Sequence, residues 1–151
     1  MRVTAPDCYS CDREAEFDDL PPRERIAYDA HWRVSHATGS DLLGWLVLMP
    51  RRHVLEVADL TDAEAASLGS WQVRLARALA QEVGTPKTYV AEFGEMPGFH
   101  LHFHVVPRPH DLAPDLRGPK VFGYLGRPEP GDLGARDDLA KRLTVALERQ
   151  P

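Results

Sequence analysis

The chain has 151 residues, a length typical of one domain, and 43% of the residues are hydrophobic. At this size folding buries about 68–70% of the surface of the unfolded chain, so a core forms without disulfides or bound groups. The formal net charge of −5 argues against a protein that wraps duplex nucleic acid, because that binding mode needs a basic face.

The sequence contains no apolar run that approaches the ~18 residues of a membrane span. Residues 1–8 lack the apolar core of a signal peptide. The two cysteines, Cys8 and Cys11, are consistent with a reducing compartment. We therefore expect a cytoplasmic protein without a membrane partner.

The first half of the chain predicts three strands. Residues 1–20 are polar, and Pro21-Pro22 follows them. Residues 25–28 and 31–35 are expected to form a hairpin of two short strands. Residues 45–49, with the sequence WLVLM, form a continuous apolar run that is typical of a buried central strand.

A long helix is predicted over residues 61–83. Thr61 and Glu64 match the capping-box pattern at its start, and Gly84 provides a stop signal at its end. Four large apolar side chains recur at helical spacing and are expected on one buried face: Leu68, Trp71, Leu75 and Leu79.

The second half of the chain predicts two more strands, over residues 88–93 and 99–106, and a C-terminal helix over 135–150. Residues 107–134 are rich in Pro and Gly and show no periodicity, so an irregular segment is expected there. Antiparallel strands with one long helix inside the strand order indicate an α+β fold of one domain, 1–151, with about five strands.

Three of the seven histidines alternate within one apolar run: His100, His102 and His104. In a strand such alternation places the three imidazoles in one row on one face. Imidazoles in a row suit metal binding, acid–base chemistry or nucleophilic attack on phosphorus. The alternative is the polar face of a half-buried strand that carries histidines without a chemical role.

The run from His100 to Val106 matches the pattern His-φ-His-φ-His-φ-φ, where φ is apolar, and so resembles the histidine triad (HIT) superfamily. The resemblance extends from about Cys8 to Arg108. It implies a HIT-like fold and a nucleotide substrate. It also implies that His102 attacks the α-phosphorus, and that His104 contacts the phosphate or serves the leaving group.

Cys8-x-x-Cys11 by itself supplies only half of the four ligands that structural zinc requires. Some bacterial HIT proteins and the uridylyltransferase branch of the superfamily look similar at four positions, which implies a zinc site at Cys8, Cys11, His53 and His100. Such a zinc would tie residues 1–20 to the sheet. Two alternatives remain: two reduced thiols without metal, and a catalytic zinc bound by all three histidines of the row.

The sequence departs from the family pattern around the expected phosphate site. Residues 95–99 lack the Gln and the hydroxyl residue that Hint-like relatives carry there, although Gly98 still allows the backbone to approach a ligand. The central strand begins Gly44-Trp45 where relatives have Gly-His. Near Ala37 there is no counterpart of the acidic residue that holds the ribose hydroxyls in Hint proteins.

These observations favour a nucleotide hydrolase or phosphoramidase that works through a covalent nucleotidyl-histidine. Substrate-binding contacts are expected from His104 and Gly98, with structural zinc as the only cofactor. The partners expected are a small nucleotide or nucleoside phosphate and a second copy of the chain, because HIT relatives form homodimers. The alternatives are nucleotidyl or phosphoryl transfer to an acceptor other than water, and a non-catalytic module that binds a nucleotide or a partner.

Overall fold

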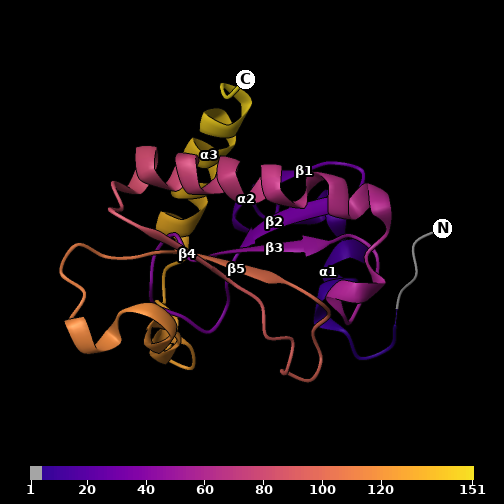
Figure 1. The fold of residues 1–151 in the computed structure, drawn as a ribbon, viewed down its shortest axis with the longest axis horizontal. Coiled ribbons are helices and arrows are strands. Elements are labelled where there is room, and N and C mark those ends of the chain that lie inside the picture. Colours follow the sequence, from indigo (N-terminus) through magenta and orange to yellow (C-terminus); the bar gives the residue numbers. More distant parts are fainter. Residues whose placement is uncertain (1–4) are drawn as a thin grey trace.

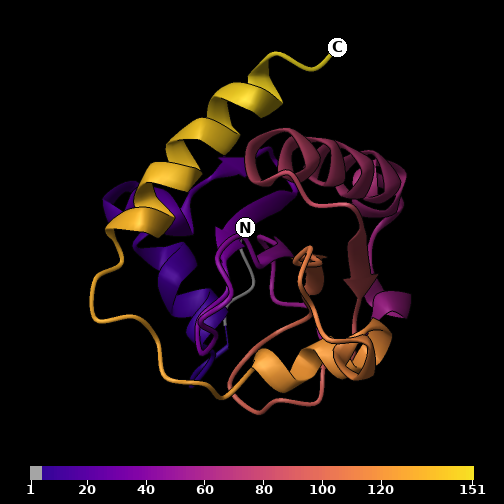
Figure 2. The same cartoon turned by 90° about the vertical axis from the view of Figure 1, so that its left-hand side faces the viewer.

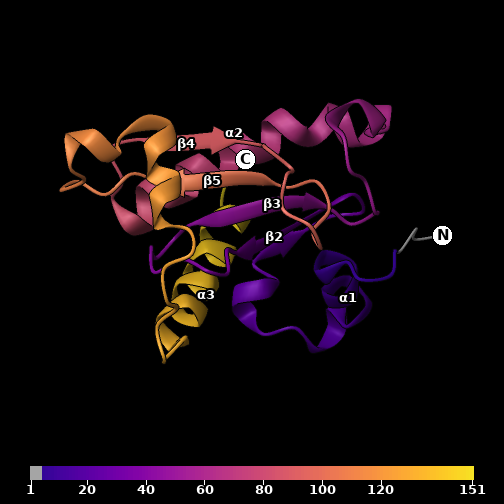
Figure 3. The same ribbon diagram turned by 90° about the horizontal axis from the view of Figure 1, so that it is seen from below.

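The computed structural model describes residues 5–151, which form an α+β fold around one antiparallel sheet (Figure 1). Its five strands lie in the order β1-β2-β3-β5-β4, and Figure 3 shows β2, β3, β5 and β4 side by side in this order from below. Their bounds are Ala27–Tyr28 for β1, Trp32–His36 for β2, Leu46–Pro50 for β3, Thr88–Ala91 for β4 and Phe103–Pro107 for β5. The expected fold class is confirmed.

Three α-helices accompany the sheet: α1 (Tyr9–Ala15), α2 (Asp62–Val83) and α3 (Gly134–Glu148). The predicted capping box of α2 is present, with Thr61 and Glu64 bonding each other's backbone amides. Gly84 ends this helix in the left-handed conformation, at φ 70°. No helix among residues 5–151 is long and apolar enough to cross a membrane.

Helices α2 and α3 cover one face of the sheet, and the main core lies between them (Figures 1 and 2). Trp71, Leu75 and Leu79 of α2 are buried there, as their spacing predicted, and Leu68 packs against the core while partly exposed. The histidine run contributes the residues that alternate with its histidines: Leu101, Phe103 and Val105. The histidines therefore face away from the main core.

A second, smaller apolar cluster lies on the opposite face, around the buried Trp45 and Val121. Residues 107–134 supply part of this cluster and are more regular than expected, because they contain two 3₁₀ helices, Pro114–Leu116 and Gly118–Tyr124. A bridge between Ser40 and Leu125 ties the segment to the body of the protein. The sequence did not predict these two helices, because short 3₁₀ helices produce no periodic pattern of apolar residues.

Two strand boundaries differ from the prediction. Strand β5 begins at Phe103 rather than at residue 99, so His100 and His102 precede it. Strand β3 ends at Pro50, which has no N–H to donate to a neighbouring strand. The amide of Leu101 donates to the carbonyl of Val54, which lies beyond the end of β3. Strand β4 ends at Ala91 rather than at residue 93, and the Phe93 ring packs on Phe122.

Helix α1 was not expected, because residues 1–20 show no apolar periodicity. Long-range contacts hold it in place. Its buried Glu14 accepts hydrogen bonds from Arg33 of β2 and from Arg51, while the amide of Tyr9 donates to the carbonyl of Gly98. The first four residues of the expected 1–20 segment lie outside the described residues.

Candidate functional site

Four side chains from three parts of the chain meet beside the start of β5. Cys8 precedes α1 and Cys11 lies within it, so their three-residue spacing places both thiols on one side of the helix. His53 follows β3, and His100 lies three residues before β5. One ligand atom from each residue lies within 4.8 Å of the others, and all except His53 are buried.

The distances between these atoms fit a tetrahedral zinc ion. Nδ1 of His100 lies 3.7 Å from Sγ of Cys8 and 3.6 Å from Sγ of Cys11, and Nδ1 of His53 lies 3.3 Å from Sγ of Cys11. Zinc bound at its usual distances holds sulfur and nitrogen ligands about 3.5 Å apart. The Nε2 of His100 is 2.9 Å from the carbonyl of Pro50. That partner assigns the ring proton to Nε2 and leaves Nδ1 free to bind a metal.

The ring of His102 is oriented by its own backbone neighbourhood. Its Nδ1 lies 2.8 Å from the carbonyl oxygen of His100, which accepts only a proton-bearing nitrogen. The proton therefore belongs on Nδ1, and Nε2 keeps its lone pair. His102 lines the pocket of the protein, so this nitrogen is available to a bound molecule.

His104 carries its proton on the opposite nitrogen. The indole N–H of Trp45, which is fully buried, donates to Nδ1 of His104 at 3.0 Å. Nδ1 is thus an acceptor, and Nε2 bears the proton. Burial, and to a smaller extent the neighbouring His102, lowers the pKa of His104 to about 3, so the ring is neutral at pH 7. The two ring centroids lie 4.7 Å apart.

Aromatic rings cover His104. Phe122 of the second 3₁₀ helix stacks edge-on against both His104 and Trp45, at centroid distances of 4.9 and 5.2 Å. Phe93 packs on Phe122 in turn, at 5.0 Å. Phe122 and Leu125 of the 107–134 segment therefore form the part of the pocket wall next to His104.

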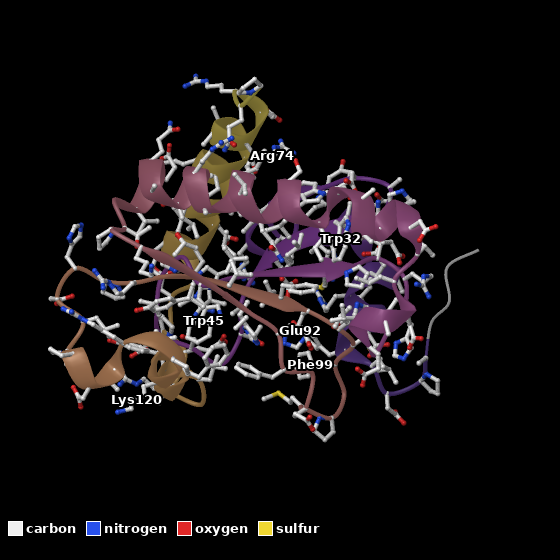
Figure 4. The ribbon with its side chains drawn as sticks, viewed as in Figure 1. Trp32, Trp45, Arg74, Glu92, Phe99 and Lys120 are labelled. Atoms are coloured by element: carbon white, nitrogen blue, oxygen red, sulfur yellow. The ribbon has the colours of Figure 1, made fainter. Side chains whose placement is uncertain are left out.

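A single pocket of about 510 Å³ contains His102 and His104. Strands β2 and β3 line it with Arg33, Ser35, Val47 and Met49. Helix α1, the 93–99 loop and Phe122 form other parts of its wall. Figure 4 shows Phe99 on the side of the sheet away from α2, where the loop borders the pocket. The volume is in the range typical of small-molecule sites.

Comparison with known proteins gives the family of the chain. The family model described as the HIT domain matches residues 21–111. The chain belongs to the HIT family. No curated protein matches the chain.

Solved structures of other HIT proteins share the fold. A zinc-bound histidine triad family protein from Mycobacterium smegmatis is 22% identical, with a TM-score of 0.67 and 94% of each chain covered. A hypothetical histidine triad nucleotide-binding protein from Sulfolobus tokodaii is 16% identical, with a TM-score of 0.70 and coverage of 93% and 92%. A histidine triad protein from Bradyrhizobium japonicum is 24% identical, with a TM-score of 0.68 and coverage of 88% and 95%.

The structure places the predicted residues of this HIT protein in two adjacent groups. The four metal-ligand candidates form one cluster, and His102 and His104 share the pocket. Gly98 has a φ of 85° and lies between the pocket residues Pro97 and Phe99, with its carbonyl bound to the amide of Tyr9. The two groups are joined through His100, whose ring belongs to the cluster and whose carbonyl accepts from His102.

Sequence reasoning missed the contacts that hold His104. Trp45 starts an apolar run and reads as a core residue, and Phe122 lies in a segment without periodicity. The sequence predicted no role for His36. In the structure it ends β2 and its ring bonds the backbone on both sides of the turn that leads to β3. Its Nε2 accepts from the amide of Gly44, its Nδ1 bonds the carbonyl of Ala37, and burial lowers its pKa to about 4.

Proposed function

We propose that this chain is a hydrolase of nucleotides that cleaves a P–N or P–O–P bond at the α-phosphate through a covalent nucleotidyl-histidine. The observation that carries the proposal is that His102 and His104, which share one pocket, are hydrogen-bonded so that only one of them has a proton on Nε2. His102 offers an unprotonated Nε2, whereas His104 offers an Nε2–H. One is a nucleophile and the other a donor, which is the pair that phosphoryl chemistry requires.

In the first step the lone pair on Nε2 of His102 forms a bond to the α-phosphorus, and the bond from phosphorus to the leaving group breaks. The carbonyl of His100 stabilises the positive charge that develops on the His102 ring, because it accepts from Nδ1. Nε2–H of His104 donates to the phosphate or to the leaving group. Water then attacks phosphorus, the bond from phosphorus to Nε2 of His102 breaks, and its electron pair returns to that nitrogen. The nucleoside monophosphate is released, and the proton that the water loses passes to the solvent, which replaces the proton taken up by the leaving group.

Structural zinc is the cofactor we propose, held by Cys8, Cys11, His53 and His100. With four protein ligands it has no open position for substrate or water, so it supplies rigidity rather than a reactive group. The cluster includes the residue whose carbonyl orients His102, and it holds α1 against the sheet. The zinc-bound relative from Mycobacterium smegmatis supports this reading.

The proposed ligand is a small nucleotide or nucleoside phosphate, supported by the name of the nucleotide-binding relative from Sulfolobus tokodaii. Gly98 is proposed to let the backbone approach that ligand. A cytoplasmic homodimer without a nucleic acid polymer or membrane partner completes the proposal. Light scattering of the purified protein tests its mass, and a monomer at all concentrations contradicts the dimer.

The test compares wild-type protein with His102→Ala on an adenosine phosphoramidate and a dinucleoside polyphosphate. Loss of the nucleophile is expected to lower turnover about a thousandfold or more, with fold and metal content retained. His110→Ala is the matched control, because this exposed histidine bonds only the carbonyl of Gly84. Wild-type protein with no turnover and no histidine adduct would contradict the hydrolase.

A further inference from the structure

The floor of the pocket changes character from one strand to the next. On β3 the pocket is lined by the apolar Val47 and Met49, whereas on β2 it is lined by Ser35 and Arg33. The strand register places these residues directly opposite each other, Ser35 against Val47 and Arg33 against Met49. Strand β3, with the apolar pair, is next to β5, and strand β2, with the polar pair, is one strand further away.

The same register gives the position of this polar pair relative to the reactive histidines. Val47 pairs with His104 on one side and with Ser35 on the other, so the three lie in one row across β5, β3 and β2. Neighbouring strands are about 4.8 Å apart, which places the backbone of Ser35 about 10 Å from that of His104. A nucleotide that lies along this row with its phosphate over β5 would extend its sugar over β3 and its base over β2.

Two serine hydroxyls at this end of the pocket lack partners. Ser35 of β2 and Ser10 of α1 both line the pocket, with only 6% and 4% of their surfaces exposed. Neither hydroxyl has a hydrogen-bond partner among residues 5–151, and neither oxygen is among the fully enclosed polar atoms without a partner. Both oxygens are therefore accessible from the pocket. A hydroxyl that is free of protein partners can donate to or accept from a polar group of a bound ligand.

Two charged residues line the same pocket as the two hydroxyls. One terminal nitrogen of Arg33 donates only to Sδ of Met49, at 3.3 Å, and a thioether is a weak acceptor. The carboxylate of Glu24 also lines the pocket, held by the hydroxyl of Tyr9 at 2.9 Å and by Nη2 of Arg13 at 2.7 Å. This end of the pocket thus offers a donor, an acceptor and two hydroxyls that can act as either.

The loop that follows β4 brings several large apolar side chains to the pocket. Phe99, Met96 and Phe93 come from the loop that follows β4, and the last two are more than half exposed at 59% and 56%. Flat apolar side chains over a polar floor suit a planar group that stacks on one side and hydrogen-bonds at its edge. A nucleobase has both properties.

We infer that Ser10 and Ser35, with Arg33 and Glu24 beside them, read the hydrogen-bonding edge of the substrate's nucleobase. This inference rests on the proposed function for the placement of the phosphate at His102. It assigns the choice of base to residues about two strands away from the chemistry. An apolar slot would accept any planar ring, whereas this floor distinguishes bases by their exocyclic groups.

The test is equilibrium binding of nucleoside 5′-monophosphates to the zinc-containing protein, measured by calorimetry. The probes are the adenosine and guanosine nucleotides and the purine riboside nucleotide, which keeps the ring without an exocyclic amino or keto group. We expect one of the first two to bind about three- to tenfold more tightly than purine riboside monophosphate for each hydrogen bond made. Equal affinities for all three would overturn the inference, as would an absence of binding.

Ser35→Ala and Ser10→Ala are each expected to weaken binding of the preferred nucleotide about three- to tenfold and to leave the purine riboside nucleotide within twofold. Ser67→Ala is the matched control, since its hydroxyl donates to the carbonyl of Glu64 in α2, outside the pocket. The inference is wrong if both serine variants weaken all probes equally or have no effect. It is also wrong if the effect of Ser35→Ala vanishes with the 2′-deoxy nucleotide, because the contact is then to ribose.

These outcomes are separable from the fate of the proposed function. Selective binding that depends on Ser35, in a protein that turns over no substrate, supports the base-reading floor and contradicts the hydrolase. Turnover that depends on His102 but proceeds equally with every base contradicts the floor alone. Binding and adduct formation are therefore measured on the same preparations.

Discussion

Trp45→Phe removes the one donor that Nδ1 of His104 has in the structure. The indole N–H is 3.0 Å from that nitrogen and the Trp45 side chain is fully buried, so no solvent replaces it. A buried acceptor left without a partner costs about 1–3 kcal/mol of folding free energy. The smaller ring adds a cavity, and we expect a total loss of about 2–4 kcal/mol. Turnover should fall about ten- to a hundredfold, because His104 is no longer held in one orientation and tautomer.

Trp32→Phe is the matched control for this variant. Trp32 is also fully buried, and its indole N–H donates to the carbonyl of Glu64 at 3.1 Å. Figure 4 shows it on the side of the sheet covered by α2, whereas Trp45 lies on the opposite side. Urea unfolding should show a similar loss of stability in both variants.

Steady-state kinetics with an adenosine phosphoramidate should show a lower kcat and an altered pH profile only for Trp45→Phe. An unchanged kcat in Trp45→Phe would refute the role given to this donor. An equal loss in both variants would show that stability alone is responsible.

The remaining predictions concern the metal, the pH and the long helix. Protein purified without added zinc should contain about one equivalent of zinc. Cys8→Ser combined with Cys11→Ser should lose both this zinc and the affinity for nucleotide, because the N-terminal segment that includes α1 carries both thiols and part of the pocket lining. Metal-free wild-type protein of full stability would contradict the zinc site. Burial lowers the pKa of His36 to about 4 and that of His104 to about 3 from their usual 6.5, so the unfolded chain binds more protons below pH 6.5 and stability is lost as the pH falls through that window. Each group contributes up to about 1.4 kcal/mol per pH unit, and a wild-type urea midpoint that is equal at pH 7 and pH 5 would refute this. Thr61→Ala should cost about 1 kcal/mol in urea unfolding through loss of the helix cap, with kcat unchanged.

Local patterns predicted the parts of this fold that local physics determines. The capping box and the four-residue apolar spacing defined α2, and the alternation at Leu101, Phe103 and Val105 defined which side of the histidine run is buried. The exact start of β5 was not predictable in the same way. The pairing of β5 with β3 stops at Phe103 and Leu48, and two residues further along β3 Pro50 has no N–H to donate.

In the candidate site, too, the residue types could be predicted from the sequence, whereas features that depend on long-range contacts could not. The alternating histidines His100, His102 and His104 were enough to predict metal binding or nucleophilic chemistry. The set of four metal ligands was predicted from the resemblance to the HIT superfamily. The tautomers of His100 and His104 depend on contacts with Pro50 and Trp45, which are distant in sequence, whereas that of His102 depends on the carbonyl of His100. Residues such as Ser10, Ser35 and Phe122 carry no periodic signal, and only the folded chain brings them to the pocket.

The most direct test of the central claim is a rapid acid or base quench of wild-type protein during turnover of an adenosine phosphoramidate, followed by peptide mass spectrometry. The account predicts a mass increase of one nucleotidyl group on the peptide that contains His102, absent from His102→Ala. Turnover without any protein adduct, or an adduct on another residue, would contradict it.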